Sequence, residues 1–259
     1  MKAKLWKALQ ATLLVAVLSL VGAVTYTTVQ YLRTSPRFDV TKVVVLGWQR
    51  VTETQVLNQA DVPNKANVFS VDLDGIRERV EKLQWVRHAI VQRVLPDTIT
   101  IKIIEREPVG LARIDGQIYQ FDTDAAVLDF DPSTGINFPI LDGLQPKDVE
   151  GNLRRVDLYR RVLKDLEGKD SLSEIQINEA DEVKIVPSDE PMLVNLGVGE
   201  FRSRWLWYLS LKSQIAEVYP DTVEVDFRFK PGPILKFRTD SPEKENEERV
   251  VWDAEKRSL

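Results

Sequence analysis

The stretch Leu95–Ala112, LPDTITIKIIEREPVGLA, decides the fold of the first half of this chain. Pro96 and Asp97 favour a turn, and the residues after them alternate in a strand-like pattern. Because successive side chains of a strand point to opposite faces, one face is apolar (Ile99, Ile101, Ile103) and the other polar (Thr98, Thr100, Lys102). Pro108 then ends the pattern, since proline is excluded from central strands.

The residues before this strand predict a small α+β domain. Val40–Leu46 is β-branched and apolar and predicts a strand, and Trp85–Val94 predicts another. Between them, Thr52 and Gln55 have capping-box spacing, so a helix is expected from Thr52 to about Ala60. Asp72 stands where a second cap belongs, before apolar residues at helical spacing (Leu73, Ile76, Val80 and Leu83). We expect two helices on one face of a three-strand mixed sheet.

The N-terminus predicts a membrane helix. Three lysines (Lys2, Lys4 and Lys7) precede a run, Ala8–Leu32, that contains no charged residue. An apolar helix of roughly 20 residues crosses the hydrocarbon core of a bilayer, and lysines mark its cytoplasmic side. A cleaved signal peptide is the alternative, since Val21 and Ala23 have the spacing of a cleavage site. The uncharged run continues past Ala23, which favours a retained anchor with the rest of the chain outside the cytoplasm.

The residues after Pro108 predict a β-rich domain. Short alternating runs between turn sequences predict strands at 109–114, 117–121, 125–130, 173–179, 181–187 and 191–197. Apolar residues at helical spacing predict helices at 153–166 and 201–215. A terminal hairpin is expected from Val223 to Phe237. The fold class of the whole chain is therefore α+β, with antiparallel strands and two flanking helices in this domain.

The terminal hairpin is the strongest candidate for a binding surface. Its first strand alternates, with one apolar face (Val223, Val225, Phe227, Phe229) and one charged face (Glu224, Asp226, Arg228). As the last predicted pair of strands, it is expected to leave a sheet edge whose free amides and carbonyls a partner strand can use. The alternative is an ordinary edge hairpin, protected by Pro231, Pro233 and Lys236.

The tail, residues 240–259, is expected to be disordered. It contains seven acidic and four basic residues with little apolar material, so burial cannot offset the entropy of ordering it. Val250, Val251 and Trp252 are the exception. For them, local docking or a partner contact is the alternative to a frayed end.

Composition argues against most catalytic and nucleic-acid-binding classes. Lys plus Arg number 35 against 40 Asp plus Glu, a net charge of -5, whereas nucleic-acid binding usually needs a basic excess. There is no cysteine, which excludes disulfides and thiol chemistry. His88 is the only histidine, and no phosphate-binding, zinc or serine-hydrolase motif occurs. We expect no enzyme, no cofactor, no metal, no small-molecule substrate and no nucleic-acid partner.

Three charged clusters have structural explanations. The acidic group after residue 121 (Asp122, Asp124, Asp129, Asp131) begins like a calcium loop, but apolar residues then occupy ligand positions, so a turn is expected. Glu105 and Glu107 flank one side of a strand end and Arg106 the other, which indicates a polar end rather than an acid–base pair. The basic pairs in 153–166 (Arg154–Arg155 and Arg160–Arg161) are expected to be solvated.

The first domain resembles the POTRA domain of the bacterial cell-division family FtsQ/DivIB. The resemblance rests on Gln84–Val86 (QWV), the Pro96–Asp97 turn and Glu105–Pro108 (EREP), and the order of parts also fits. Gly110 departs from the family, where alanine is common. The implied parts are a cytoplasmic tail (1–7), a transmembrane helix (8–32), the POTRA domain (38–107), a β domain (108–239) and a disordered tail (240–259).

The resemblance implies a non-enzymatic scaffold of the division machinery. Such a protein is single-pass type II in the plasma (inner) membrane at the division septum, held in the lipid bilayer here by Leu9–Val29. Its C-terminal domains are periplasmic or extracytoplasmic. It links cytoplasmic and extracytoplasmic division components, including other septal membrane proteins, and helps control septal peptidoglycan synthesis.

The same resemblance implies a partner and a site. In FtsQ/DivIB proteins the terminal sheet receives a strand from FtsB, which is itself in complex with FtsL. Carried onto this sequence, the implied partner-binding residues are Phe229, Lys230, Gly232, Leu235 and Phe237. Pro231 and Pro233 depart from the family's usual turn.

Two other classes are alternatives. POTRA domains also occur in outer-membrane assembly and secretion factors, but the chain after Leu111 is too short for a large barrel of membrane strands. A secreted hydrolase with an unfamiliar site is the other alternative, although no group of residues suggests a substrate.

Overall fold

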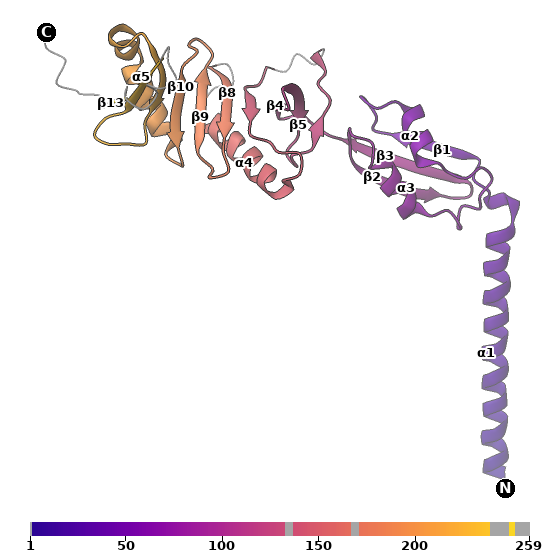
Figure 1. Ribbon diagram of the computed structural model, residues 1–259. Helices are drawn as coiled ribbons and strands as arrows, with labels where there is room; N and C mark the ends of the chain where they lie inside the picture. Colours follow the sequence, from indigo (N-terminus) through magenta and orange to yellow (C-terminus); the bar gives the residue numbers. More distant parts are fainter. Residues whose placement is uncertain (1, 133–136, 167–170, 239–248, 252–259) are drawn as a thin grey trace. The chain divides into compact units, whose positions relative to one another are not determined.

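The computed structural model describes residues 2–132, 137–166, 171–238 and 249–251 (Figure 1). The chain divides into two compact units, Met1–Arg106 and Glu107–Leu259. The first unit begins with one long helix, α1 (Lys2–Thr34), in which Thr12–Thr34 is long and apolar enough to cross a membrane. Within this span, the hydroxyls of Thr25 and Thr28 donate to carbonyls one turn earlier in the same helix.

The rest of the first unit is a three-strand sheet with two helices. After a short 3-10 helix, η1 (Pro36–Phe38), its elements are β1 (Lys42–Leu46), α2 (Glu53–Ala60), α3 (Leu73–Val80), β2 (Val86–Val94) and β3 (Thr98–Glu105). The strand order is β1-β3-β2, with β1 parallel and β2 antiparallel to β3. The predicted mixed sheet is therefore confirmed.

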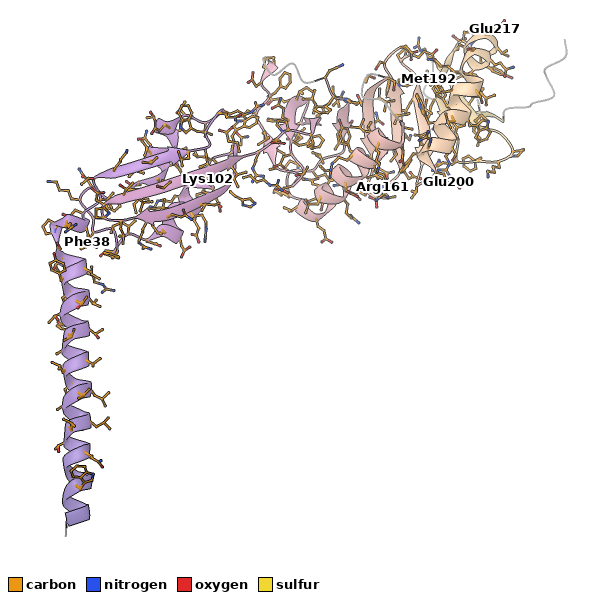
Figure 2. The ribbon with its side chains drawn as sticks, turned by 180° about the vertical axis from the view of Figure 1, so that it is seen from behind. Phe38, Lys102, Arg161, Met192, Glu200 and Glu217 are labelled. Carbon is orange, nitrogen blue, oxygen red and sulfur yellow. The ribbon has the colours of Figure 1, made fainter. Side chains whose placement is uncertain are left out.

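The isoleucines of β3 form the centre of this unit's core. Ile99, Ile101 and Ile103 are at most 2% exposed and belong to one cluster with apolar residues of both helices (Val56, Ala60, Ile76 and Val80). Lys102 alternates to the other face and is exposed (Figure 2). The period-two pattern of the sequence thus distinguishes the buried face from the open one.

Both helices begin where their caps predict. The Thr52 hydroxyl accepts from the Gln55 backbone N–H, while the Gln55 side chain accepts from the Thr52 N–H. In α3, the Asp72 carboxylate accepts from the Gly75 N–H. Each cap satisfies amides that the first helical turn leaves without a partner.

Glu105 has a role that its position at a strand end did not predict. Its carboxylate accepts hydrogen bonds from the backbone N–H groups of Gln49 (2.8 Å), Arg50 (2.9 Å) and Val51 (3.0 Å). These residues lie in the connection from β1 to α2, which turns at Gly47 with a φ of 83°. Glu105 therefore fastens that connection to the end of β3.

Replacing Glu105 with alanine is expected to lower the free energy of unfolding of the first unit by about 2 kcal/mol, because three backbone amides lose a charged acceptor. Glu107→Ala is the matched control, since Glu107 is exposed. Thermal unfolding of the two variants measures the difference. Equal stabilities would contradict the anchoring role.

The second unit is built on one ten-stranded sheet. Its elements are β4 (Gly110–Ile114), β5 (Gln117–Phe121), β6 (Val127–Leu128), β7 (Ile140–Asp142), α4 (Val149–Asp165), β8 (Leu172–Ile177), β9 (Val183–Pro187), β10 (Leu193–Gly197), α5 (Phe201–Val218), β11 (Thr222–Asp226), β12 (Ile234–Phe237) and β13 (Arg249–Val251). The strand order is β13-β12-β11-β10-β9-β8-β7-β4-β5-β6. The β-rich domain with two helices is confirmed, and three of its pairs are parallel: β4–β7, β7–β8 and β10–β11.

The two faces of this sheet differ in chemistry. On one face, the helices α4 and α5 contribute Tyr159 and Tyr208 to a single core with strand residues such as Val225 and Leu235. The Tyr159 hydroxyl donates to the Pro139 carbonyl at 2.7 Å. The other face carries a row of polar residues at paired positions across the strands (Arg113, Asp142, Gln176, Lys184, Asn195 and Asp226).

The turn after β5 confirms the structural explanation of the acidic cluster. The Asp122 carboxylate accepts from the backbone N–H groups of Asp124 and Ala126, both at 2.9 Å. Ala125 between them has a φ of 58°. The predicted strand 125–130 is consequently reduced to the two residues of β6, because residues 125 and 126 belong to this turn.

The prediction of solvated basic pairs on α4 is wrong for one residue. Arg155 is 2% exposed and its guanidinium donates to Asp148 at 2.9 Å and to Asn152 at 3.2 Å. Asp148 also caps α4 by accepting from the Gly151 N–H. Arg154, Arg160 and Arg161 are exposed, as expected (Figure 2 labels Arg161).

Candidate partner-binding edge

The terminal hairpin is shorter than the alternating sequence predicted. β11 ends at Asp226 and β12 begins at Ile234, so residues 227–233 form the connection. The two strands pair antiparallel, with Val225 opposite Leu235. Because β11 also pairs with β10, the hairpin continues the main sheet and places β12 near its end.

A carboxylate turns the chain after β11. Asp226 accepts from the Arg228 backbone N–H at 3.0 Å and from its guanidinium Nη2 at 2.7 Å. Arg228 also donates to Glu182, at 2.5 Å. Phe227 is buried and packs against Trp207. The Phe229 side chain, in contrast, is 46% exposed, and its ring lies 5.5 Å from the Arg228 guanidinium. Phe227 and Phe229 do not share a face, and that prediction is wrong.

The structure separates the five predicted site residues into two groups. Phe229 and Lys230 are exposed in the connection, which leaves their side chains accessible. Leu235 is buried in the core, Gly232 is buried in the connection, and Phe237 is partly buried, with its ring 5.8 Å from that of Tyr219. At Leu235, therefore, the side chain is not accessible to a partner.

Glu224 links three strands on the polar face. Its Oε1 accepts from the Lys184 ammonium of β9 at 3.0 Å, and its Oε2 accepts from the Lys236 ammonium of β12 at 2.7 Å. Burial raises the pKa of the Glu224 carboxyl, but the hydrogen bonds from Lys236 and Lys184 outweigh it, so the pKa lies below its ordinary value. This carboxylate thus holds β12 to the sheet in its ionised form.

Glu224 is expected to make the stability of the second unit depend on pH. Since its pKa is lower in the folded protein than in the unfolded chain, its contribution is present above the ordinary value of 4.5 and is lost as the pH falls through the folded value. Glu224→Gln should cost roughly 1–2 kcal/mol at pH 7, with a smaller difference from wild type near pH 3. Urea unfolding across this range measures it. The exposed Glu217→Gln is the control, and a pH-independent deficit would contradict the assignment (Figure 2).

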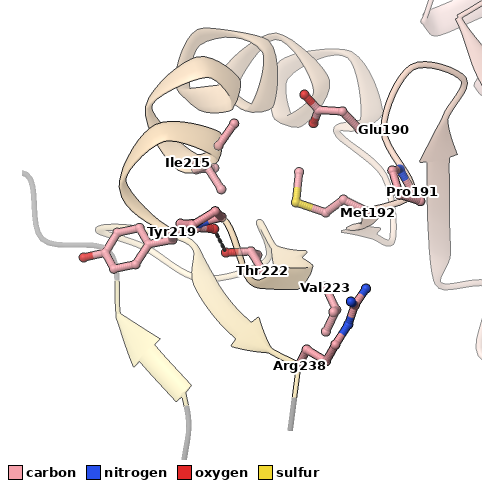
Figure 3. Close-up of a pocket in the computed structure, with 10 residues that line it drawn as sticks. Glu190, Pro191, Met192, Ile215, Tyr219, Thr222, Val223 and Arg238 are labelled. Carbon is pink, nitrogen blue, oxygen red and sulfur yellow. Dashed lines mark hydrogen bonds between the residues drawn. The ribbon is translucent and has the colours of Figure 1, made fainter. Parts of the chain in front are cut away.

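A pocket of about 270 Å³ lies at the end of the hairpin (Figure 3). Met192, Ile215 and Val223 supply apolar lining, while Glu190 and Arg238 lie at its rim. The Thr222 hydroxyl donates to the Tyr219 carbonyl at 2.7 Å, which fixes the turn from α5 into β11. Arg238 directly follows β12, so the pocket adjoins the end of that strand.

The outer edge of β12 is not open, contrary to expectation. Residues 249–251 form β13 and pair antiparallel with β12. This pairing agrees with the local docking that was left open for Val250 and Val251, and the remainder of the tail, 240–248 and 252–259, lies outside the described residues. β13 now stands at the end of the strand order.

The most important site residues that sequence reasoning missed are Asp226, Glu224 and Tyr219. The alternation around β11 placed the two acids on a polar face. Lys184, which donates to Glu224, and Glu182, which accepts from the Arg228 guanidinium beside Asp226, are both distant in sequence and have no local signal. Among the described residues, no group of three or more His, Cys, Asp or Glu is arranged to hold a metal ion. The features that this region presents are the strand pairing at the end of the sheet and the adjoining pocket.

Comparison with known proteins identifies the first unit. Residues 38–106 match the family model of the POTRA domain, FtsQ-type. The chain is 30% identical over 179 residues to the cell division protein FtsQ of Koribacter versatilis, covering 65% of this chain and 52% of that protein. It is 27% identical over 206 residues to FtsQ of Syntrophotalea carbinolica, covering 76% of this chain and 73% of that protein. It is 31% identical over 105 residues to FtsQ of Rickettsia felis, covering 40% of this chain and 39% of that protein. The chain thus spans about half the length of the first of these relatives.

Proposed function

Since the chain is related to the FtsQ/DivIB cell-division family, we propose that it is a bitopic, non-enzymatic scaffold of the division machinery. The observation that carries the proposal is the FtsQ-type POTRA domain at residues 38–106, behind a helix able to span a membrane. Similarity to FtsQ proteins extends beyond this domain, over 206 residues in one relative. In this proposal residues 1–7 are cytoplasmic, 8–32 span the plasma (inner) membrane, and the POTRA (38–107) and β (108–239) domains are extracytoplasmic at the septum.

The partner surface in this proposal is the outer edge of β12. A strand of an FtsB-type protein, in complex with an FtsL-type protein, adds to Ile234–Phe237 through backbone hydrogen bonds, which need no side-chain access at Leu235. Phe229 and Lys230 contact the partner beside that strand, since both are exposed. A side chain of the partner, from beside its added strand, enters the pocket that Arg238 helps to line. Through this contact the protein helps to control septal peptidoglycan synthesis.

Fluorescence localisation in dividing cells tests the division role. A fusion of a fluorescent protein to the N-terminus of the full chain is expected to concentrate at the division plane. The control is the same fusion with α1 replaced by an unrelated membrane helix, which keeps the POTRA and β domains and should localise equally. An even distribution around the cell membrane would overturn the proposed function, whatever the fold.

A further inference from the structure

The chain's own residues 249–251 occupy the edge to which the partner strand is proposed to bind. In β13, Val251 lies opposite Ile234, Val250 opposite Leu235 and Arg249 opposite Lys236. The other edge of β12 is paired with β11. A strand has only two edges, so β12 cannot accept a further strand while β13 is in place.

We propose that β13 is an internal competitor, which an incoming strand must displace before it can bind β12. The inference rests on the proposed function, because that function supplies the incoming strand. β13 also defines what the edge selects, namely an extended segment that runs antiparallel to β12. The ligand class is therefore a β-strand peptide and not a helix or a small molecule.

The extent of pairing makes β13 a displaceable occupant. β13 contains three residues and pairs with Ile234, Leu235 and Lys236, whereas β12 continues to Phe237. β11, on the other edge, pairs with all four residues of β12. A partner strand that spans the whole of β12 can therefore form backbone pairing at Phe237 that β13 does not make.

The covalent connection between β12 and β13 determines how strongly β13 competes with a partner strand. β13 belongs to the same chain as β12, so its pairing is intramolecular and its effective concentration is high, which compensates for its short length. A ligand that binds only the β13-free state has its apparent affinity reduced by the fraction of molecules in that state. Short strands that meet the edge by chance are excluded, while a longer strand with its own tethered contacts displaces β13.

A peptide-binding experiment tests the competitor directly. The probe is a fluorescein-labelled peptide of this chain's residues 245–255, measured by anisotropy against the full chain in detergent micelles. A variant that ends at Arg238 is expected to bind the probe roughly 5- to 20-fold more tightly than wild type. Val250→Pro, which keeps the chain length, should do the same because proline cannot donate to the ladder. Ser258→Pro, outside β13, is the control and should match wild type.

Hydrogen exchange provides a second measurement on the same proteins. Amides of residues 234–237 are expected to exchange faster in the truncated chain and in Val250→Pro than in wild type, and addition of the probe should slow them again. Equal probe affinity of all four proteins would overturn the proposal. So would a truncated chain that keeps the unfolding transition of its second unit but does not bind the probe.

The outcome also separates this inference from the function on which it rests. If truncation exposes the edge to the probe but the full chain is evenly distributed in dividing cells, the division role fails while the internal pairing stands. If the full chain localises to the division plane and truncation changes nothing, only the competitor fails. If wild type is a dimer and Val250→Pro is a monomer, β13 pairs with β12 of a second copy. That result would overturn pairing within one chain.

Discussion

Replacing Lys236 with proline is expected to weaken binding of the partner strand far more than replacing it with alanine. Proline removes a backbone N–H and fixes φ in the middle of β12, so the strand no longer offers a regular edge. Alanine removes only the ion pair of the Lys236 ammonium with Glu224. We expect a loss of roughly 100-fold for the proline variant, about 3 kcal/mol, and less than about tenfold for the alanine variant.

The measurement is binding of the extracytoplasmic part of an FtsB-type partner to each full-length variant in detergent. Unfolding of the second unit, followed in parallel, shows whether its core survives, since the core face of β12 carries Leu235 and not Lys236. Equal losses in the two variants would assign binding to the lysine side chain. Unchanged binding by a folded Lys236→Pro protein would show that β12 is not part of the binding site.

Tyr159 is expected to be among the most sensitive positions for the stability of the second unit. Its side chain is fully buried, its ring packs edge-on against Phe121 at 5.3 Å, and its hydroxyl donates to the Pro139 carbonyl. Tyr159→Ala should therefore cost about 3–5 kcal/mol through loss of burial and the cavity that remains. Tyr159→Phe should cost about 1–2 kcal/mol, because it only leaves the buried carbonyl without its donor.

Differential scanning calorimetry of the two variants measures both effects. The first unit has its own core, so its transition is expected to stay in place and serves as an internal control. A shift of both transitions in Tyr159→Ala would contradict the independence of the two cores. A Tyr159→Phe protein as unstable as Tyr159→Ala would show that the hydroxyl, and not the ring, dominates.

The first unit could be predicted well because its signals are local. The capping residues Thr52 and Asp72 lie next to the helices that they begin, and the isoleucines of β3 show their buried face by alternation alone. Glu105 could not be assigned its role in this way. Its three amide donors lie more than fifty residues earlier in the chain, and no local pattern connects them.

The hairpin that carries the candidate site was predicted in outline, and its details were missed. Alternation continues through Phe229, so it suggested a longer strand, but Asp226 draws Arg228 back and ends the strand at residue 226. Glu182, which holds the other side of that arginine, is distant in sequence. Composition favoured a disordered tail and left docking of Val250 and Val251 only as an alternative, because charge content does not reveal that three residues of the tail can pair with β12.

Packing explains why position 110 is a glycine and not the alanine that the resemblance to FtsQ/DivIB implies. A Cβ at this position would overlap the ring of Phe121 and come within 3.0 Å of Tyr159. Alanine therefore does not fit beside the two aromatic rings of this core.

Site-specific photo-crosslinking in dividing cells tests the central claim most directly. A photoreactive amino acid placed at Lys236 on β12 is expected to give one predominant adduct, with an FtsB-type membrane protein identified by mass spectrometry. The same group at Arg160, exposed on α4, is the control and should give no such adduct. Adducts of equal yield at both positions, or none at Lys236 in cells that divide normally, would contradict a partner strand at the β12 edge.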